Sequence, residues 1–119
     1  MPGISIHVVD VARGIVARGM RVELQQPATV DAPAHRLAAG IIGANGLFEH
    51  PLLAESFARG YYEAVFHVAE FYRGAGSLAT DVPFLDRIHY RFGIADPSQH
   101  YHLPMKLTPW GYSCFRGGA

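Results

Sequence analysis

The chain has 119 residues, of which 50% are hydrophobic and 17% are charged, a composition that is typical of a folded domain and unlike that of a disordered segment. Ten basic side chains balance ten acidic ones, which does not favour electrostatic binding to nucleic acid or to an anionic membrane. No apolar run approaches the roughly 20 residues that a membrane-spanning helix needs. We therefore expect one domain over residues 1–119, with neither nucleic acid nor membrane as its partner.

Alternating apolar and polar residues predict short strands in the first half of the chain. Residues 4–9 read Ile-Ser-Ile-His-Val-Val, and alternation along a strand places Ser5, His7 and Val9 on one face. Asn and Gly tolerate positive φ, so Ala44-Asn45-Gly46 is expected to be a turn. The other strands expected here are residues 20–25, 36–42 and 61–67.

The second half continues this pattern after a short helical stretch at residues 68–72. The strands expected in this half are residues 84–94, 100–107 and 112–115. Seven or eight short strands separated by turn signals predict an all-β fold, a two-sheet β-sandwich with one short helix.

The strand at residues 100–107 has two different faces. Alternation places His102, Pro104 and Lys106 on one of them. The opposite face is apolar and consists of Tyr101, Leu103, Met105 and Leu107. The apolar face belongs in the core, which leaves His102 and Lys106 on the outside.

Two segments at the ends of the chain carry a resemblance to a known family. Residues 4–14, Ile-Ser-Ile-His-Val-Val-Asp-Val-Ala-Arg-Gly, resemble the family's opening strand with its histidine and its Asp-x-x-Arg-Gly turn. Residues 100–117 are similar to its C-terminal signature, which reads His-Tyr-His-x-Pro, then Ser-Pro-x-x-Tyr-Ser-Thr, then Tyr-Arg-Gly-Ser. The chain therefore resembles the transthyretin / 5-hydroxyisourate hydrolase family.

The resemblance implies a transthyretin-like sandwich that pairs into dimers, which stack as a homotetramer with sites in the channel between subunits. In transthyretin this channel holds thyroid hormone, and in the hydrolases it holds residues that open 5-hydroxyisourate, an oxidation product of urate. Carried over by motif, the catalytic histidines are His7 and His102. Such a pair could activate water and protonate the leaving nitrogen near neutral pH. No cofactor is implied, and no carboxylate or cysteine joins His100 and His102 at metal-ligand spacing.

The other histidines and the single cysteine are expected to be structural. The histidines in this group are His35, His50, His67, His89 and His100. Cys114 cannot form an internal disulfide, which suits a cytoplasmic protein, and alternation places it in the core as a small hydrophobic residue. The same alternation places Ser113 and Phe115 in the channel.

The sequence departs from the family pattern at positions that bear on the site. The family's arginine, in the turn Asp-x-Asp-Gly-Arg, corresponds to Leu47, which can neither orient a substrate nor stabilise negative charge. Residues 115–118 of this chain read Phe-Arg-Gly-Gly, where the family pattern has Tyr-Arg-Gly-Ser. Lys106 occupies a position where the family pattern has an aliphatic residue. Lys106 could replace the missing positive charge or act as a base or nucleophile, or it could simply be an exposed lysine. The residues expected to bind substrate are Leu47, Lys106, Ser113, Phe115 and Arg116.

Three functions remain open at this point. The first is hydrolysis of a cyclic amide-like bond in a small planar heterocycle, with 5-hydroxyisourate as the default substrate. The second is a diverged enzyme that acts on another heterocycle, because Leu47 replaces the arginine. The third is a carrier of a hydrophobic ligand, against which the two retained histidines count.

Overall fold

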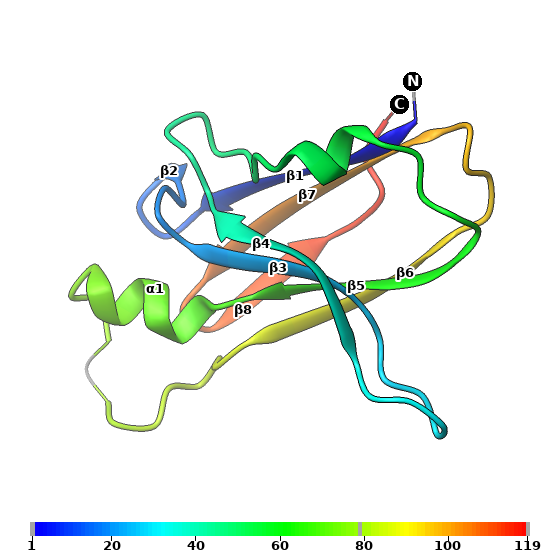
Figure 1. Cartoon of the computed structure of the whole chain (residues 1–119). Helices are drawn as coiled ribbons and strands as arrows, with labels where there is room; N and C mark the ends of the chain where they lie inside the picture. Colours follow the sequence, from blue (N-terminus) through cyan, green and yellow to red (C-terminus); the bar gives the residue numbers. More distant parts are fainter. Residues whose placement is uncertain (1, 79, 119) are drawn as a thin grey trace.

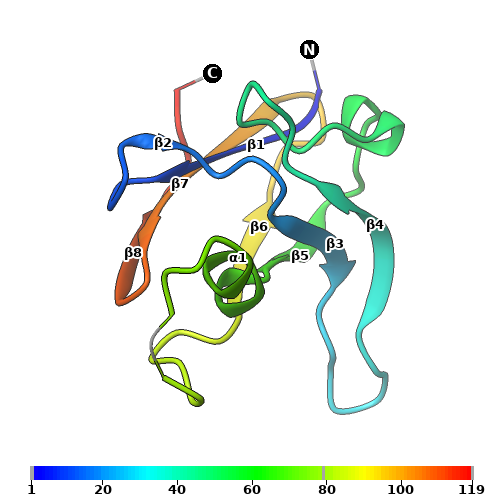
Figure 2. The ribbon, with the colours of Figure 1, turned by 90° about the vertical axis from the view of Figure 1, so that its left-hand side faces the viewer.

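Two four-stranded sheets pack face to face in the computed structural model, which describes residues 2–78 and 80–118 (Figures 1 and 2). The first sheet has the order β2 (Ile15–Val16), β1 (Gly3–Asp10), β7 (His100–Thr108), β8 (Gly111–Cys114). The second has the order β4 (His35–Ile41), β3 (Arg21–Gln26), β5 (Gly60–Phe66), β6 (Ile88–Ile94). The prediction of an all-β two-sheet sandwich with one short helix is confirmed.

Two short helical segments connect strands of the second sheet. The 3₁₀ helix η1 (Pro51–Ala54) begins at His50, whose Nδ1 accepts a hydrogen bond from the Leu52 N–H. The expected helical stretch is α1 (Val68–Gly74), which follows β5 directly and lies at the end of the molecule away from both termini (Figure 1). None of the helices in the described part of the chain has the length and apolar character needed to cross a bilayer.

Strand alternation decides which side chains form the core. In β1 the inward residues Ile4, Ile6 and Val8 are buried, whereas the outward side chains after Gly3 are only partly covered. In β7 the whole predicted apolar face is buried, which comprises Tyr101, Leu103, Met105 and Leu107. These residues belong to one hydrophobic cluster that draws from both sheets. Cys114 packs against this cluster, and burial raises the pKa of its thiol to about 11, so that the thiol stays protonated and unreactive.

The two central strands of the first sheet come from opposite ends of the chain. β1 and β7 run parallel and lie side by side (Figure 1), with Ser5 paired to His102, His7 to Pro104 and Val9 to Lys106. This register is set by long-range backbone hydrogen bonds, which no local pattern specifies. It brings the two sequence motifs together on one sheet.

The strand predicted at residues 84–94 is shorter in the structure and begins at Ile88. The Asp86 carbonyl accepts a hydrogen bond from the Ala69 N–H at the start of α1 instead of joining the ladder. Residues 84–87 therefore belong to the connection after the helix, and Phe84 is exposed. The prediction was wrong in this segment because alternation does not show which backbone groups a neighbouring helix will use.

A buried carboxylate fastens the end of β1 to α1. Asp10 is 0% exposed, and it accepts hydrogen bonds from the Tyr72 hydroxyl at 2.8 Å and from the Arg13 Nε at 2.6 Å. Burial and the negative charge of Asp10 raise the pKa of Tyr72. Both oxygens of the Asp10 carboxylate thus accept a hydrogen bond, which offsets much of the free-energy cost of burying its charge.

Candidate functional site

The outer face of the first sheet gathers the polar side chains of its two central strands. Ser5 and His7 come from β1, and His100, His102 and Lys106 come from β7. All five lie on the outer side of their strands, opposite the buried residues. His7 and His102 are diagonal neighbours in this register, because Ser5 pairs with His102 and His7 pairs with Pro104.

Hydrogen bonds hold both the ring and the backbone of His102. Its Nδ1 lies 2.6 Å from the Ser5 Oγ, and its carbonyl accepts a hydrogen bond of 2.7 Å from the Gly117 N–H. Burial, followed by the nearby charges of His100 and His7, lowers the pKa of His102. The ring is therefore neutral at neutral pH, which is the form that can accept a proton.

His7 is covered by the turn that precedes η1. Its Nε2 lies 3.1 Å from the Asn45 carbonyl, which can only accept, so the Nε2–H donates and Nδ1 is left free. A methyl group at Gly46, whose φ is +84°, would lie 2.5 Å from the His7 Nε2. Only glycine fits this position, both for the positive φ and for the close approach of the turn.

The same turn places Leu47 beside His7. The two residues form an antiparallel bridge, and on either side of it the Val8 N–H donates to the Gly46 carbonyl and the Phe48 N–H donates to the Ile6 carbonyl. The Leu47 side chain is half-buried. The position predicted to correspond to the family's arginine thus lies beside His7, and an aliphatic side chain fills it.

Lys106 and Ser113 lie further along the same sheet, and Phe115 directly follows β8. Lys106 pairs with Val9 on one side and with Ser113 on the other. Because a strand rises about 3.3 Å per residue, Lys106 lies roughly 13 Å along β7 from His102. Its side chain is exposed and makes no hydrogen bond or ion pair within the described ranges. Phe115 is also exposed.

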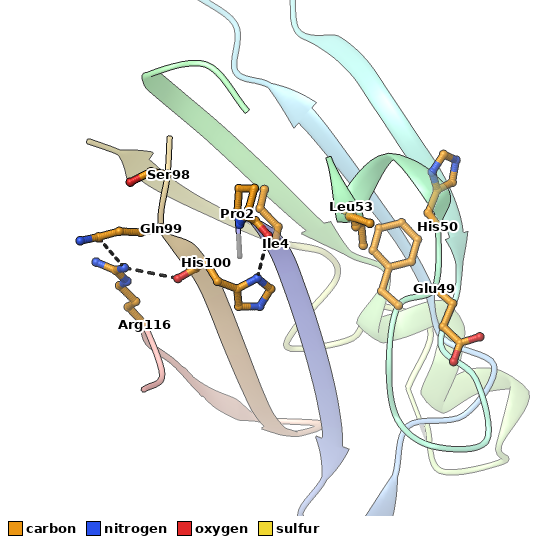
Figure 3. Close-up of a pocket in the computed structure, with 11 residues that line it drawn as sticks. Pro2, Ile4, Glu49, His50, Leu53, Ser98, Gln99, His100 and Arg116 are labelled. Atoms are coloured by element: carbon orange, nitrogen blue, oxygen red, sulfur yellow. Dashed lines mark hydrogen bonds between the residues drawn. The ribbon is translucent and has the colours of Figure 1, made fainter. Parts of the chain in front are cut away.

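Arg116 is turned away from the two histidines. Its guanidinium stacks over the ring of Tyr101, with its central carbon 4.0 Å from the ring centroid. It also donates to the Gln99 Oε1 at 3.0 Å (Figure 3). Tyr101 belongs to the inward face of β7, so the structure does not bring this positive charge to His7 or His102.

An open groove adjoins the site at the start of β1 and β7 (Figure 3). Its volume is about 1120 Å³, and Ile4, Phe48 and Leu53 give it an apolar floor. His100 and Arg116 are among the polar groups at its border. His100 therefore links this groove to the histidine pair.

Sequence reasoning missed two residues that contact the predicted histidines. Ser5 was not singled out, and His100 was expected to be inert, yet the Ser5 Oγ lies 2.8 Å from the His100 Nε2 as well as 2.6 Å from the His102 Nδ1. Alternation gave a signal for both, since Ser5 shares the face of His7 and His100 shares the face of His102. Which of them touch depended on the register of β1 against β7.

The described part of the chain contains no cluster of side chains suited to bind a metal ion. No group of three or more histidine, cysteine, aspartate or glutamate side chains there could hold a metal ion. The arrangement instead suits proton transfer, with three imidazoles on one face and a hydroxyl between two of the rings.

Nearly all of the sequence matches the model of one family. Its model, described as the HIUase/Transthyretin family, covers residues 4–117. The chain belongs to this family. Its sequence is 41% identical to a 5-hydroxyisourate hydrolase of Deinococcus radiodurans, over 98% of this chain and 96% of the relative.

Solved structures of the family are similar over nearly all of this chain. The structure of Klebsiella pneumoniae 5-hydroxyisourate hydrolase is 25% identical with a TM-score of 0.81, covering 99% of this chain and 100% of that one. The crystal structure of (S)-allantoin synthase is 31% identical with a TM-score of 0.87 and covers 98% of this chain. This chain spans only 44% of that protein. The homologues support assignment of the chain as a hydrolase-type enzyme.

Proposed function

We propose that this chain hydrolyses 5-hydroxyisourate, with His7 and His102 carrying the proton transfers. The observation that supports this most is the placement of the two histidines as diagonal neighbours on one face of the first sheet, with His102 held in its neutral form. The choice of 5-hydroxyisourate as substrate rests on the relatives that are named as 5-hydroxyisourate hydrolases.

In this proposal His102 is the base and His7 is the acid. The His102 Nε2 takes a proton from water while the water oxygen attacks the carbonyl carbon of the ring amide. The C–N bond then breaks, and a protonated His7 gives its proton to the leaving nitrogen. No cofactor takes part. Leu47, Ser113, Phe115, Lys106 and Arg116 would shape the space for a small planar heterocycle.

We further propose that the protein is one domain over residues 1–119 that works as a homotetramer, a dimer of dimers, with the outer face of the first sheet lining an inter-subunit channel. Exposed large apolar side chains near this face support the assembly, since such groups usually mark an interface. They are Val11 and Phe115. Neither nucleic acid nor a membrane is a partner, and the unpaired thiol of Cys114 supports a cytoplasmic location.

A second candidate, a diverged enzyme for another heterocycle, is supported by Leu47. The antiparallel bridge sets Leu47 directly beside His7, and the guanidinium of Arg116 points elsewhere. Among the contacts of the described residues, no arginine reaches either histidine. A hydrolase that lacks this cation would lose one means of stabilising developing negative charge, which usually costs ~10²–10³ in rate.

The deciding experiment is turnover of freshly generated 5-hydroxyisourate, followed by ultraviolet absorbance and compared with the spontaneous rate. The His102→Ala variant serves as the matched control. A clear acceleration by the wild type that is lost in the variant supports the first proposal. A wild-type rate equal to the spontaneous rate rejects it in favour of another substrate.

A further inference from the structure

Three side chains and one backbone carbonyl form a continuous line of hydrogen bonds on the outer face of the first sheet. The His100 Nδ1 lies 3.3 Å from the Pro2 carbonyl, the His100 Nε2 lies 2.8 Å from the Ser5 Oγ, and the Ser5 Oγ lies 2.6 Å from the His102 Nδ1. The parallel register of β1 and β7 brings these groups together, because it pairs Gly3 with His100 and Ser5 with His102. Figure 3 shows the Pro2 end of it.

The carbonyl at one end sets the direction of every bond. The Pro2 oxygen can only accept, so the His100 Nδ1 carries the hydrogen, and the Nε2 of a neutral His100 is an acceptor. The Ser5 hydroxyl must then donate to the His100 Nε2 and accept from the His102 Nδ1–H. A neutral His102 is left with a bare Nε2, which is the atom that a general base needs.

We propose that Ser5 and His100 are positioning residues that fix His102 with its Nε2 free and receive the proton that His102 gains. The inference rests on the proposed function, in which His102 takes a proton from water. His102 gains this proton at Nε2, its Nδ1–H moves to the Ser5 Oγ, and the Ser5 hydroxyl hydrogen moves to the His100 Nε2. The result is a neutral His102 protonated at Nε2 and a positively charged His100, so protons and charge balance.

The position of His100 suits this role. His100 borders the open groove of about 1120 Å³, where water can remove the proton from its ring. Among the described residues, the ionisable groups near the line include His7 from β1 and Arg116 from the C-terminal tail, whose Nη2 donates to the His100 carbonyl at 3.4 Å. Burial and the charges of His100 and His7 lower the pKa of His102, so His102 does not keep a positive charge and the proton passes along the line.

Nitrogen NMR of the substrate-free protein tests the positioning role directly. Long-range proton–nitrogen spectra show which ring nitrogen of His102 carries the hydrogen. We expect Nδ1–H in the wild type, in Ser5→Thr, which keeps the hydroxyl, and in the control His35→Gln, which changes an exposed histidine of the other sheet. We expect Nε2–H in Ser5→Ala. A wild-type His102 that carries its hydrogen on Nε2, or a Ser5→Ala variant with an unchanged tautomer, overturns the inference.

Kinetics separate positioning from proton transfer. Ser5→Ala should lower kcat by roughly 10- to 100-fold, because a histidine held in the wrong tautomer is a poor base, and Ser5→Thr should recover most of the loss. His100→Gln offers Ser5 an amide oxygen at the place of Nε2 but cannot take up a proton. It should keep the Nδ1–H tautomer of His102 and still lower kcat about tenfold.

The two proposals fail in different ways. Wild-type turnover that His102→Ala abolishes and Ser5→Ala leaves unchanged overturns the relay while the hydrolase function stands. Failure of the wild type to turn over 5-hydroxyisourate rejects the function on that substrate. The tautomer of His102 then decides the positioning role on its own, with Nδ1–H supporting it and Nε2–H overturning it.

Discussion

Gly117 lies against the ring of His102. A methyl group at this position would be 2.8 Å from the His102 Cδ2, and the Gly117 N–H donates to the His102 carbonyl at 2.7 Å. The C-terminal tail is thereby fastened over one of the two histidines of the site. A residue with any side chain would have to move the ring or the tail.

Gly117→Ala should therefore reduce catalysis while leaving the fold intact. Displacement of the His102 ring by even a fraction of an ångström weakens its alignment, and we expect a loss of roughly tenfold in kcat/KM. Gly118→Ala is the matched control, since a methyl group there meets no atom of the described residues within 4 Å. Equal rates for the two variants would show that the tail does not position His102.

The histidine pair should behave as a unit. His7→Ala and His102→Ala should each lower turnover by ~10²-fold or more without a large change in melting temperature, because acid and base act in the same reaction. The double variant should be little slower than the slower single variant. Steady-state kinetics of the three variants test this, and small additive losses would mean that the rings only shape the pocket.

Leu47→Arg distinguishes an ordinary hydrolase from a remodelled one. If the site has merely lost its arginine, a guanidinium beside His7 should speed 5-hydroxyisourate turnover by ~10-fold or more. If the channel serves another substrate, the change should bring no gain. Lys106→Leu is the companion variant, damaging in the first case and harmless in the second. Fast turnover by the wild type together with slower turnover by Leu47→Arg would show that leucine belongs to a working site.

The lowered pKa of His102 predicts the pH dependence of both activity and stability. The base must be neutral, so the acid limb of kcat/KM should lie below the ordinary histidine value of about 6.5. The unfolded chain takes up this proton at a higher pH than the folded chain does. The contribution of His102 to stability is therefore present above pH 6.5 and is lost as the pH falls toward the folded value. An acid limb above pH 6.5 in the rate profile would contradict this.

Light scattering tests the assembly. The stacked-dimer arrangement predicts a mass about four times the 13.0 kDa of the chain. Phe115→Glu, which places a charge on an exposed apolar side chain directly after β8, should shift the protein toward smaller species. A wild-type monomer at micromolar concentration would reject both the tetramer and a channel shared between subunits.

The sequence by itself determined the parts of this protein that depend on local order. Side chains alternate along any strand, so the burial of Ile6 and Leu103 and the outward placement of His7 and His102 could be predicted without knowing which strands pair. The motifs at the two chain ends also predicted the fold, because each occupies a single continuous segment. The core position of Cys114 followed from the same alternation.

Only the tertiary structure decided which outward groups touch one another. The parallel register of β1 and β7 joined Ser5 to both His100 and His102, and the turn before η1 set Leu47 beside His7. The course of the C-terminal tail turned the guanidinium of Arg116 toward Tyr101 and away from the pair. These contacts depend on hydrogen bonds between segments distant in the chain, whose choice follows from the packing of the whole sandwich and not from the residues near each position.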